Sequence, residues 1–287
     1  MKFNIEKIRK KKPLKELLGF SIINIDKPTG PTSFSISDYV RKSLKLNKTS
    51  HFGTLDPQVT GVLPVALGRA CRLNDYFMHR NKTYVGIMRL HKEIEESVLR
   101  GEIKKFIGKI KQLPPVRSRV KRAVREREVS SFNILEIEGK DVLFETEVQA
   151  GTYIRKLCDD IGKNLGGAHM LELRRTKAGM FNESKMFTLY DLDEAISELN
   201  NGDESKLREM LTPAEIVSEL YETIEVKEES LKQLLTGKPL FKKDLVKNSK
   251  FENNEETIVV YSKDRFVGCY KLILEEDLIA RPLFIYN

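Results

Sequence analysis

The distribution of apolar residues predicts alternating strands and helices in the first third of the chain. Residues 20–26 form an isoleucine-rich run that is typical of a strand, and residues 83–90 form a second such run. Between them, apolar residues recur every four positions after a Thr-Ser pair that can cap a helix, which predicts a helix over residues 32–44. Residues 72–78 also have a helical pattern. Residues 51–64 are punctuated by glycine and proline and are expected to form a loop.

The middle of the chain combines a hairpin with two helices. An apolar stripe at positions 99, 103, 106 and 110 predicts one helix. Two strands, at 129–138 and 141–149, flank a Glu-Gly-Lys turn and are typical of a hairpin. A second helix, at 152–165, ends at a Gly-Gly pair, and residues 168–176 alternate as a strand. Because the hairpin implies antiparallel pairing, the fold class is α+β, or mixed α/β.

The pattern restarts near residue 221. An acidic stretch at 194–221 contains a Thr-Pro-Ala-Glu sequence at 212–215 that predicts a capped helix start. The predicted elements beyond it are a strand at 223–226, a short helix that ends at Gly237, a hairpin at 257–274 and a last strand at 281–286. These elements predict a small β-barrel or sandwich with its own core, so that removing residues 221–287 should leave the preceding domain folded.

Charge concentrates in two clusters. The 287 residues carry 50 Lys+Arg and 42 Asp+Glu, a formal net charge of +8, which makes a polyanionic partner plausible. Six basic residues lie between Lys7 and Lys15, where they form either a phosphate-binding surface or a solvated, disordered tail. Residues 117–127 contain six basic residues and one acid, and the self-repulsion of such a loop is best relieved by phosphates.

Missing motifs exclude several kinds of chemistry. The sequence has no Gly-x-Gly dinucleotide fingerprint and no P-loop, and its four histidines and three cysteines have no metal-ligand spacing. We therefore expect no nucleotide cofactor and no metal. The cysteines lie far apart, as is typical of free thiols in a reduced cytoplasm. With no apolar run long enough to span a bilayer and no signal peptide, the expected location is cytoplasmic.

One segment combines chemistry with an unusual setting. Asp56 lies between glycines and prolines inside the otherwise apolar run at 51–64. The ordinary explanation of an Asp-Pro pair is an Asx-turn that stabilises its own loop. The alternative is a reactive carboxylate carried by a constrained loop.

Five segments in order resemble the motifs of the TruB/dyskerin family of RNA pseudouridine synthases, and together they span nearly the whole chain. They are residues 24–33 (NIDKPTGPTS), 51–64 (HFGTLDPQVTGVLP), 82–84 (KTY), 150–155 (AGTYIR) and 167–176 (GAHMLELRRT). Residues 88–91 and 113–122 are similar to the archaeal/eukaryotic branch. The resemblance implies a mainly antiparallel sheet flanked by helices in a catalytic domain at 19–213. It also implies a basic N-terminal extension at 1–18 and a PUA-like RNA-binding domain at 221–287.

The resemblance implies catalytic roles for Asp56, Tyr84 and Arg155. An ionised carboxylate near C1′ of the uridine is the indispensable group, either as nucleophile or as base at C2′. Arg155, at the start of a predicted helix, would hold Asp56 charged and oriented as a buried pair, rather than being an exposed first-turn arginine. Tyr84 shares a strand face with residues 86, 88 and 90 and would stack on the uracil; otherwise it is a half-buried strand tyrosine.

Further residues are implied to bind substrate. Tyr153 and Leu173 would wall the pocket, or pack in the core. His51 would enter the RNA while the target base is flipped out, or be a capping or surface histidine. Lys27 would contact the RNA backbone or brace the loop. The RNA-binding residues implied by the second basic cluster are Arg117, Arg119, Lys121 and Arg122.

The implied function is isomerisation of uridine in tRNA, at the T-loop uridine, or in rRNA as the catalytic subunit of an H/ACA ribonucleoprotein. The implied partners are substrate RNA, an H/ACA guide RNA and the accessory proteins of that particle. A non-catalytic RNA-binding scaffold of ribosome biogenesis is the alternative. An RNA methyltransferase would need a glycine-rich cofactor loop, which the sequence lacks.

Overall fold

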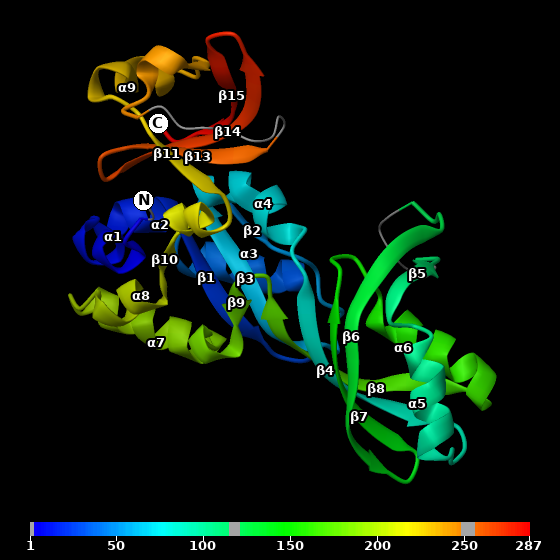
Figure 1. The fold of residues 1–287 in the computed structure, drawn as a ribbon. Coiled ribbons are helices and arrows are strands. Elements are labelled where there is room, and N and C mark those ends of the chain that lie inside the picture. The colour runs from blue at the N-terminus through cyan, green and yellow to red at the C-terminus, as the bar shows by residue number, and fades with distance from the viewer. Residues whose placement is uncertain (1–2, 115–120, 248–255) are drawn as a thin grey trace.

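The computed structural model of the chain describes residues 3–114, 121–247 and 256–287, and it contains two β-sheets (Figure 1). The strands of the larger sheet are β1 (Phe20–Lys27), β2 (Thr49–His51), β3 (Thr60–Gly68), β4 (Lys82–Leu90), β5 (Gly108–Gln112), β6 (Arg125–Glu138), β7 (Asp141–Val148), β8 (Ala168–Ala178), β9 (Phe181–Asn182) and β10 (Thr212–Pro213). The smaller sheet consists of β11 (Glu222–Glu225), β12 (Leu240–Phe241), β13 (Thr257–Ser262), β14 (Arg265–Glu275) and β15 (Leu278–Ile285).

The larger sheet has the order β10-β1-β3-β8-β4-β7-β6-β5, with β2 paired to β3 and β9 paired to β8. The smaller sheet has the order β11-β13-β14-β15-β12. Within the described residues, β3 pairs with β8 in parallel and β11 with β13 in parallel, and the other strand pairs are antiparallel. The predicted mixed α/β class with a mainly antiparallel sheet is confirmed.

Helices surround both sheets (Figure 1). The α-helices are α1 (Ile5–Lys11), α2 (Leu14–Gly19), α3 (Ser33–Ser43), α4 (Asn74–Met78), α5 (Glu96–Lys104), α6 (Ile154–Gly162), α7 (Leu189–Asn200), α8 (Ser205–Met210) and α9 (Glu228–Leu234). Short 3₁₀ turns are η1 (Arg69–Leu73), η2 (Lys163–Leu165), η3 (Glu183–Lys185), η4 (Ala214–Glu219) and η5 (Lys242–Asp244).

The central strands β1 and β3 are buried on both faces. One face carries Ile23, Ile25 and Leu63 into a cluster with apolar residues of α2, α3, α7 and α8. The other face carries Phe20 and Val62 into a cluster with η1, α4 and the smaller sheet. Double burial explains why these strands are almost continuously apolar instead of alternating. The third cluster packs α5 and α6 against β4, β6, β7 and β8.

Three expectations about local structure are wrong. The predicted loop at 51–64 ends early, because β3 begins at Thr60 and pairs with β1 and β8. The predicted helix through position 110 stops at Lys104, since Gly108 has a φ of +95° and Ile110 belongs to β5, paired with β6. The predicted helix start at 212–215 is instead a short strand, β10, on the edge of β1, followed by a 3₁₀ turn.

The N-terminal residues are not a solvated tail. They form α1 and α2, and Arg208 donates hydrogen bonds to the carbonyl oxygens of Arg9 and Lys12 at 2.6 and 2.8 Å. Lys12 forms an ion pair with Glu215, which is buried. The basic cluster is therefore part of a folded brace between the two sheets.

The smaller sheet has a core of its own, but it also shares one with the larger sheet. Phe284 and Phe266 belong to the same cluster as Phe20, and the ring of Tyr286 stacks on Phe20 with centroids 4.0 Å apart. The smaller sheet therefore has a separate core and, at this face, a second apolar contact with the larger sheet. We expect deletion of residues 221–287 to expose Phe20 and its apolar neighbours.

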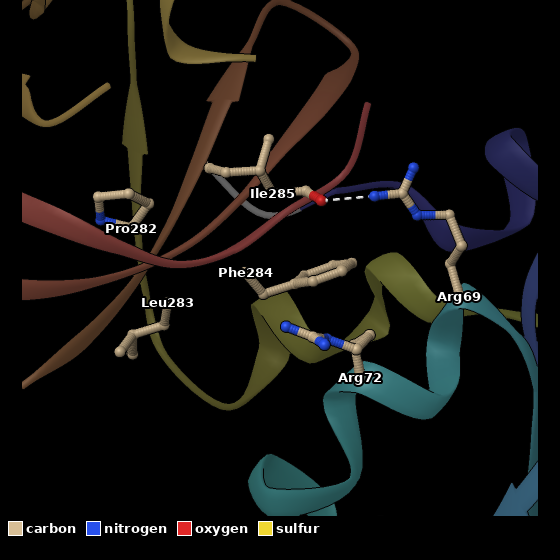
Figure 2. A pocket seen from close by; sticks show the side chains of 6 residues that line it. All are labelled: Arg69, Arg72, Pro282, Leu283, Phe284 and Ile285. Carbon is tan, nitrogen blue, oxygen red and sulfur yellow. Dashed lines mark hydrogen bonds between the residues drawn. The ribbon is translucent and has the colours of Figure 1, made fainter. Parts of the chain in front are cut away.

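Polar contacts and a cavity also lie at this junction. Arg69 of η1 donates a hydrogen bond to the carbonyl oxygen of Ile285 at 2.8 Å, as Figure 2 shows. A cavity of about 460 Å³ adjoins it, lined by Arg69, Arg72 and four consecutive residues of β15, at 282–285 (Figure 2).

Gly61 is required where β3 meets β8. Its φ is +100°, and a Cβ at this position would lie 2.2 Å from the carbonyl oxygen of Arg175. Gly202 has a similar φ of +95°, but a Cβ there would have no neighbour within 4 Å. Comparing the two positions separates backbone strain from steric exclusion.

We expect Gly202→Ala to lower the free energy of unfolding by about 1 kcal/mol, the cost of a left-handed alanine. Gly61→Ala should cost a further ~1–3 kcal/mol, because the backbone of β8 must move to admit the methyl group. Thermal denaturation of both variants measures the difference. Equal melting temperatures would show that β8 is not tightly packed against the glycine.

Candidate active site

Asp56 and Arg155 come together beside the larger sheet, although they belong to different elements. Asp56 lies in the loop between β2 and β3, and Arg155 lies in the first turn of α6. The Oδ2 atom of Asp56 is 2.9 Å from Nη2 of Arg155. The side chains are 49% and 55% exposed, so the expected buried pair is instead accessible from solvent. An RNA could therefore reach the carboxylate without a movement of the loop.

The residues next to Asp56 anchor its loop. Leu55 and Val59 are buried, and the Leu55 amide donates a hydrogen bond to Oγ of Ser33 at 2.8 Å. The Val59 amide donates to the carbonyl oxygen of Asp56 at 3.0 Å, and the Gly30 amide donates to Pro57 at 2.9 Å. Two buried side chains thus hold a short turn whose outermost side chain is the carboxylate.

Lys27 holds this loop through hydrogen bonds to its backbone. It is fully buried, and its Nζ donates to the carbonyl oxygens of Pro28, Pro57 and Val59 at 2.8–2.9 Å. Burial lowers the pKa of Lys27, attraction by Asp56 opposes this effect, and repulsion by Arg175 adds to it. Because three carbonyls use the three N–H groups of an ammonium, Lys27 has none left for a phosphate. Of the two expected roles, the contacts favour bracing.

Arg175 is the residue that sequence reasoning missed. Its side chain is only 1% exposed, and it donates to the carbonyl oxygens of Val62 at 2.8 Å and Gly53 at 3.0 Å, on the two sides of Asp56. Burial lowers the pKa of Arg175, and Tyr84 acts in the opposite direction. One signal was available: Arg175 is two residues after Leu173 in the same strand and therefore points to the same face.

Tyr84 and Leu173 belong to the apolar cluster that also contains two buried residues of the loop. Both are 8% exposed, and they share a cluster with Leu55, Val59 and Ile154. Tyr84 also lies on the predicted buried face of β4, which alternates from Lys82 to Leu90. Tyr153 is half-buried and precedes α6; Gln112 hydrogen-bonds to both its amide and its carbonyl, at 3.0 and 3.2 Å.

His51 lies at the end of β2, ahead of the loop. Its Nε2 is 3.3 Å from Oγ1 of Thr54. Burial lowers the pKa of His51, and repulsion by Arg175 lowers it further. At neutral pH its ring is therefore uncharged.

The structure describes half of the predicted RNA-binding set. Lys121 and Arg122 are exposed just before β6, whereas Arg117 and Arg119 lie outside the described residues. Arg127 of β6 lies against Gly151, where an added Cβ would be 3.2 Å from its Nη2, so this arginine supports the turn before α6. The proposed phosphate contacts at Lys121 and Arg122 stay predictions.

Among the described residues, no group of three or more His, Cys, Asp or Glu side chains could hold a metal ion. Across the same ranges, no helix is both long and apolar enough to cross a membrane.

Two family models together match most of the chain. Residues 41–154 match the model of the N-terminal domain of TruB family pseudouridylate synthases. Residues 155–218 match the C-terminal domain of tRNA pseudouridylate synthase B. A probable tRNA pseudouridine synthase B from Archaeoglobus fulgidus is 38% identical over 274 residues, which cover 94% of this chain and 84% of that protein. The corresponding protein from Methanocaldococcus jannaschii is 41% identical over 249 residues, covering 86% and 74%.

Two solved structures have the same fold over nearly the whole chain. One is a Cbf5-Nop10-Gar1 complex, with a TM-score of 0.87 and 37% identity, covering 97% of this chain and 88% of the matched chain. The other is an H/ACA ribonucleoprotein bound to a substrate RNA containing 2′-deoxyuridine, also at a TM-score of 0.87, with 34% identity and coverage of 97% and 89%.

Lys82 is a second buried lysine beside the loop, and it differs from Lys27 in one respect. Its Nζ donates to two carbonyl oxygens, those of Met78, at 2.6 Å, and Arg80. A neutral amine has two N–H groups and can satisfy both. Burial, and secondarily Arg175, lowers the pKa of Lys82 to about 7.

This pKa predicts a pH-dependent stability. In the unfolded chain the pKa of a lysine is about 10.4, so between pH 7 and 10 the unfolded state binds a proton that the folded state has released. The free energy of unfolding of the wild type, relative to Lys82→Met, should therefore rise with pH across this window, by up to about 1.4 kcal/mol per unit. Below pH 7 the difference should be constant.

Chemical denaturation at several pH values measures this slope, with the exposed Lys104→Met as the control. If the free energies of unfolding of the wild type and Lys82→Met change with pH in parallel, the lowered pKa of Lys82 is contradicted.

Proposed function

The chain belongs to the TruB family of pseudouridine synthases, in its archaeal branch, and we propose that this isomerase acts on uridine in tRNA and on RNA held by an H/ACA guide particle. The observation that supports the proposal most directly is the ion pair of Asp56 and Arg155, accessible from solvent beside the apolar cluster that contains Tyr84 and Leu173. A non-catalytic scaffold would have no need for a carboxylate presented in this way.

The reaction needs little beyond these side chains. The N1–C1′ bond of uridine breaks, the uracil turns, and C5 bonds to C1′. Atoms are neither added nor removed, and the base is not oxidised or reduced. We propose that Asp56 is the reacting carboxylate, either as a nucleophile or as a base at C2′. Arg155 orients it through the 2.9 Å contact. Leu173 and Tyr153 confine the uracil.

We propose that Tyr84 acts on the detached base. Its hydroxyl and the guanidinium of Arg175 are close enough to interact electrostatically. We propose that the ring stacks on the uracil and that this hydroxyl assists in moving the C5 proton.

The partners follow from the solved relatives. Those structures are complexes with Nop10 and Gar1 and with a substrate RNA. We propose that this chain assembles with accessory proteins of the same kind and with a guide RNA, that residues 221–287 form a PUA-like RNA-binding domain, and that Lys121 and Arg122 contact phosphates. The three cysteines of the chain are free and buried, which supports a reduced, cytoplasmic location.

Asp56→Asn should abolish pseudouridine formation, because the side chain keeps its shape but loses the charge that the reaction requires. Its RNA affinity should change less than tenfold, under ~1.4 kcal/mol, since one exposed carboxylate contributes little to binding a polyanion. Single-turnover assays for pseudouridine, together with a binding titration, measure both effects. Turnover within a few-fold of the wild type would exclude Asp56 as the reacting group.

The combined change Lys121→Glu/Arg122→Glu should have the opposite effect. If both residues bind phosphates, the affinity falls, and the slope of log K against log salt decreases by ~0.7–0.9 for each phosphate that is no longer bound. The single-turnover rate at saturating RNA should remain that of the wild type. Asp56→Asn is the matched control, because its salt slope should be that of the wild type. An unchanged slope in the double variant would mean that these side chains face only solvent.

A further inference from the structure

A second cavity adjoins the catalytic loop. It has a volume of about 430 Å³ and lies between α3, the strand β2 with the start of the loop, and α4. Gly53 and Thr54 form part of its wall, three and two residues before Asp56. Since a chain extends by at most ~3.6 Å per residue, the Cα atoms of Thr54 and Asp56 are no more than about 7 Å apart. The cavity is therefore within reach of a nucleotide next to a uridine bound at Asp56.

The aromatic ring of Phe34 lies at the cavity and does not pack in a hydrophobic core. Phe34, in the first turn of α3, is 66% exposed, whereas the buried positions of that helix are Ser33, Ile36, Ser37 and Val40. An exposed ring beside a cavity is a surface on which a base can stack.

The polar groups that line the cavity are mostly uncharged donors and acceptors, which favour a neutral ligand. The Oδ1 atom of Asn74 accepts a hydrogen bond from Ser50 at 2.8 Å, and this bond leaves the donors of the amide NH₂ unused. His51 is uncharged at neutral pH, because burial lowers its pKa, so its ring offers one donor and one acceptor. Among the described residues of the lining, the only charged pair is Arg41 with Asp38, at 2.8 Å; Asp38 also pairs with Lys42, which lies outside the lining. A phosphate would find no free cation in this lining.

We propose that this cavity is a subsite for the nucleobase adjoining the target uridine, stacked on Phe34 and hydrogen-bonded by the Asn74 amide. The inference rests on the proposed function, because it requires an RNA at Asp56. It extends that function by assigning a second base-binding site, lined by residues other than Tyr84 and Leu173. Extrusion of the target uridine separates its neighbours from their stacking partners, and the cavity supplies a replacement for one of them.

The experiment combines protein variants with altered RNA. Three versions of a tRNA T-arm stem-loop are prepared: one intact, one abasic on the 5′ side of the target uridine and one abasic on the 3′ side. The variants are Phe34→Ala and Asn74→Asp, which keeps the acceptor for Ser50 but removes the NH₂ donor. Tyr190→Ala is the matched control, because Tyr190 is an 86% exposed aromatic in the first turn of another helix, α7.

On intact RNA, Phe34→Ala and Asn74→Asp should each lower kcat/KM about tenfold, within the range for one base–aromatic contact, while the rate at saturating RNA is kept. On one of the two abasic RNAs these effects should disappear, because the base that the side chains contact is already missing. Tyr190→Ala should have no effect on any of the three RNAs.

If the decreases persist equally on all three RNAs, or do not occur on intact RNA, the subsite is excluded. Absence of pseudouridine with the wild-type protein on intact RNA would instead count against the proposed tRNA substrate. Phe34 is exposed, so its variant should fold normally, and unchanged melting temperatures verify this.

Discussion

The guanidinium of Arg175 is buried beneath the catalytic loop, and the arrangement of the site depends on it. A buried cation is costly unless its donors are satisfied, and Arg175 donates hydrogen bonds to the carbonyl oxygens of Gly53 and Val62. Lys27 and Lys82 are buried nearby and also bond to main-chain carbonyls. Because a carbonyl belongs to the backbone, each of these bonds fixes the path of the chain rather than the position of one side chain.

This way of fixing the loop explains how Asp56 can be both ordered and exposed. The proposed reacting carboxylate must meet a large RNA, so it cannot be enclosed in a preformed cavity, yet it must be held in position. The loop is held by its backbone and by Leu55 and Val59, which leaves the carboxylate exposed and paired with Arg155. Arg155 comes from a different element, α6, whose start is itself held by Gln112. The pair therefore depends on two independently anchored segments.

Much of this could be predicted from the sequence, and the exceptions have physical causes. Periodicity located α3, β4, the hairpin of β6 and β7, and α6, because each buries one regular face. The continuous apolar run of β1 located that strand, which is buried on both faces. It failed at Ile110, where a left-handed glycine ends the helical spacing, and at Thr60, where strand pairing overrides turn composition. The motifs predicted correctly that Asp56 and Arg155 lie together. They did not predict that both side chains are exposed. The role of Arg175 could not be predicted, because its partners are carbonyls, which residue types do not encode.

Packing also connects the smaller sheet to the chemistry. Phe284 and Phe266 of that sheet share a cluster with Phe20 of β1 and with Phe52, the second residue before Thr54 in the catalytic loop. Phe52 in turn stacks on Phe77 of α4, with ring centroids 4.7 Å apart. Protein interiors are close-packed and transmit displacement, so the smaller sheet cannot move far from this cluster without opening it. If residues 221–287 bind an RNA segment, as we propose, this packing would hold that segment at a fixed distance from Asp56. The smaller sheet would then position the RNA as well as bind it.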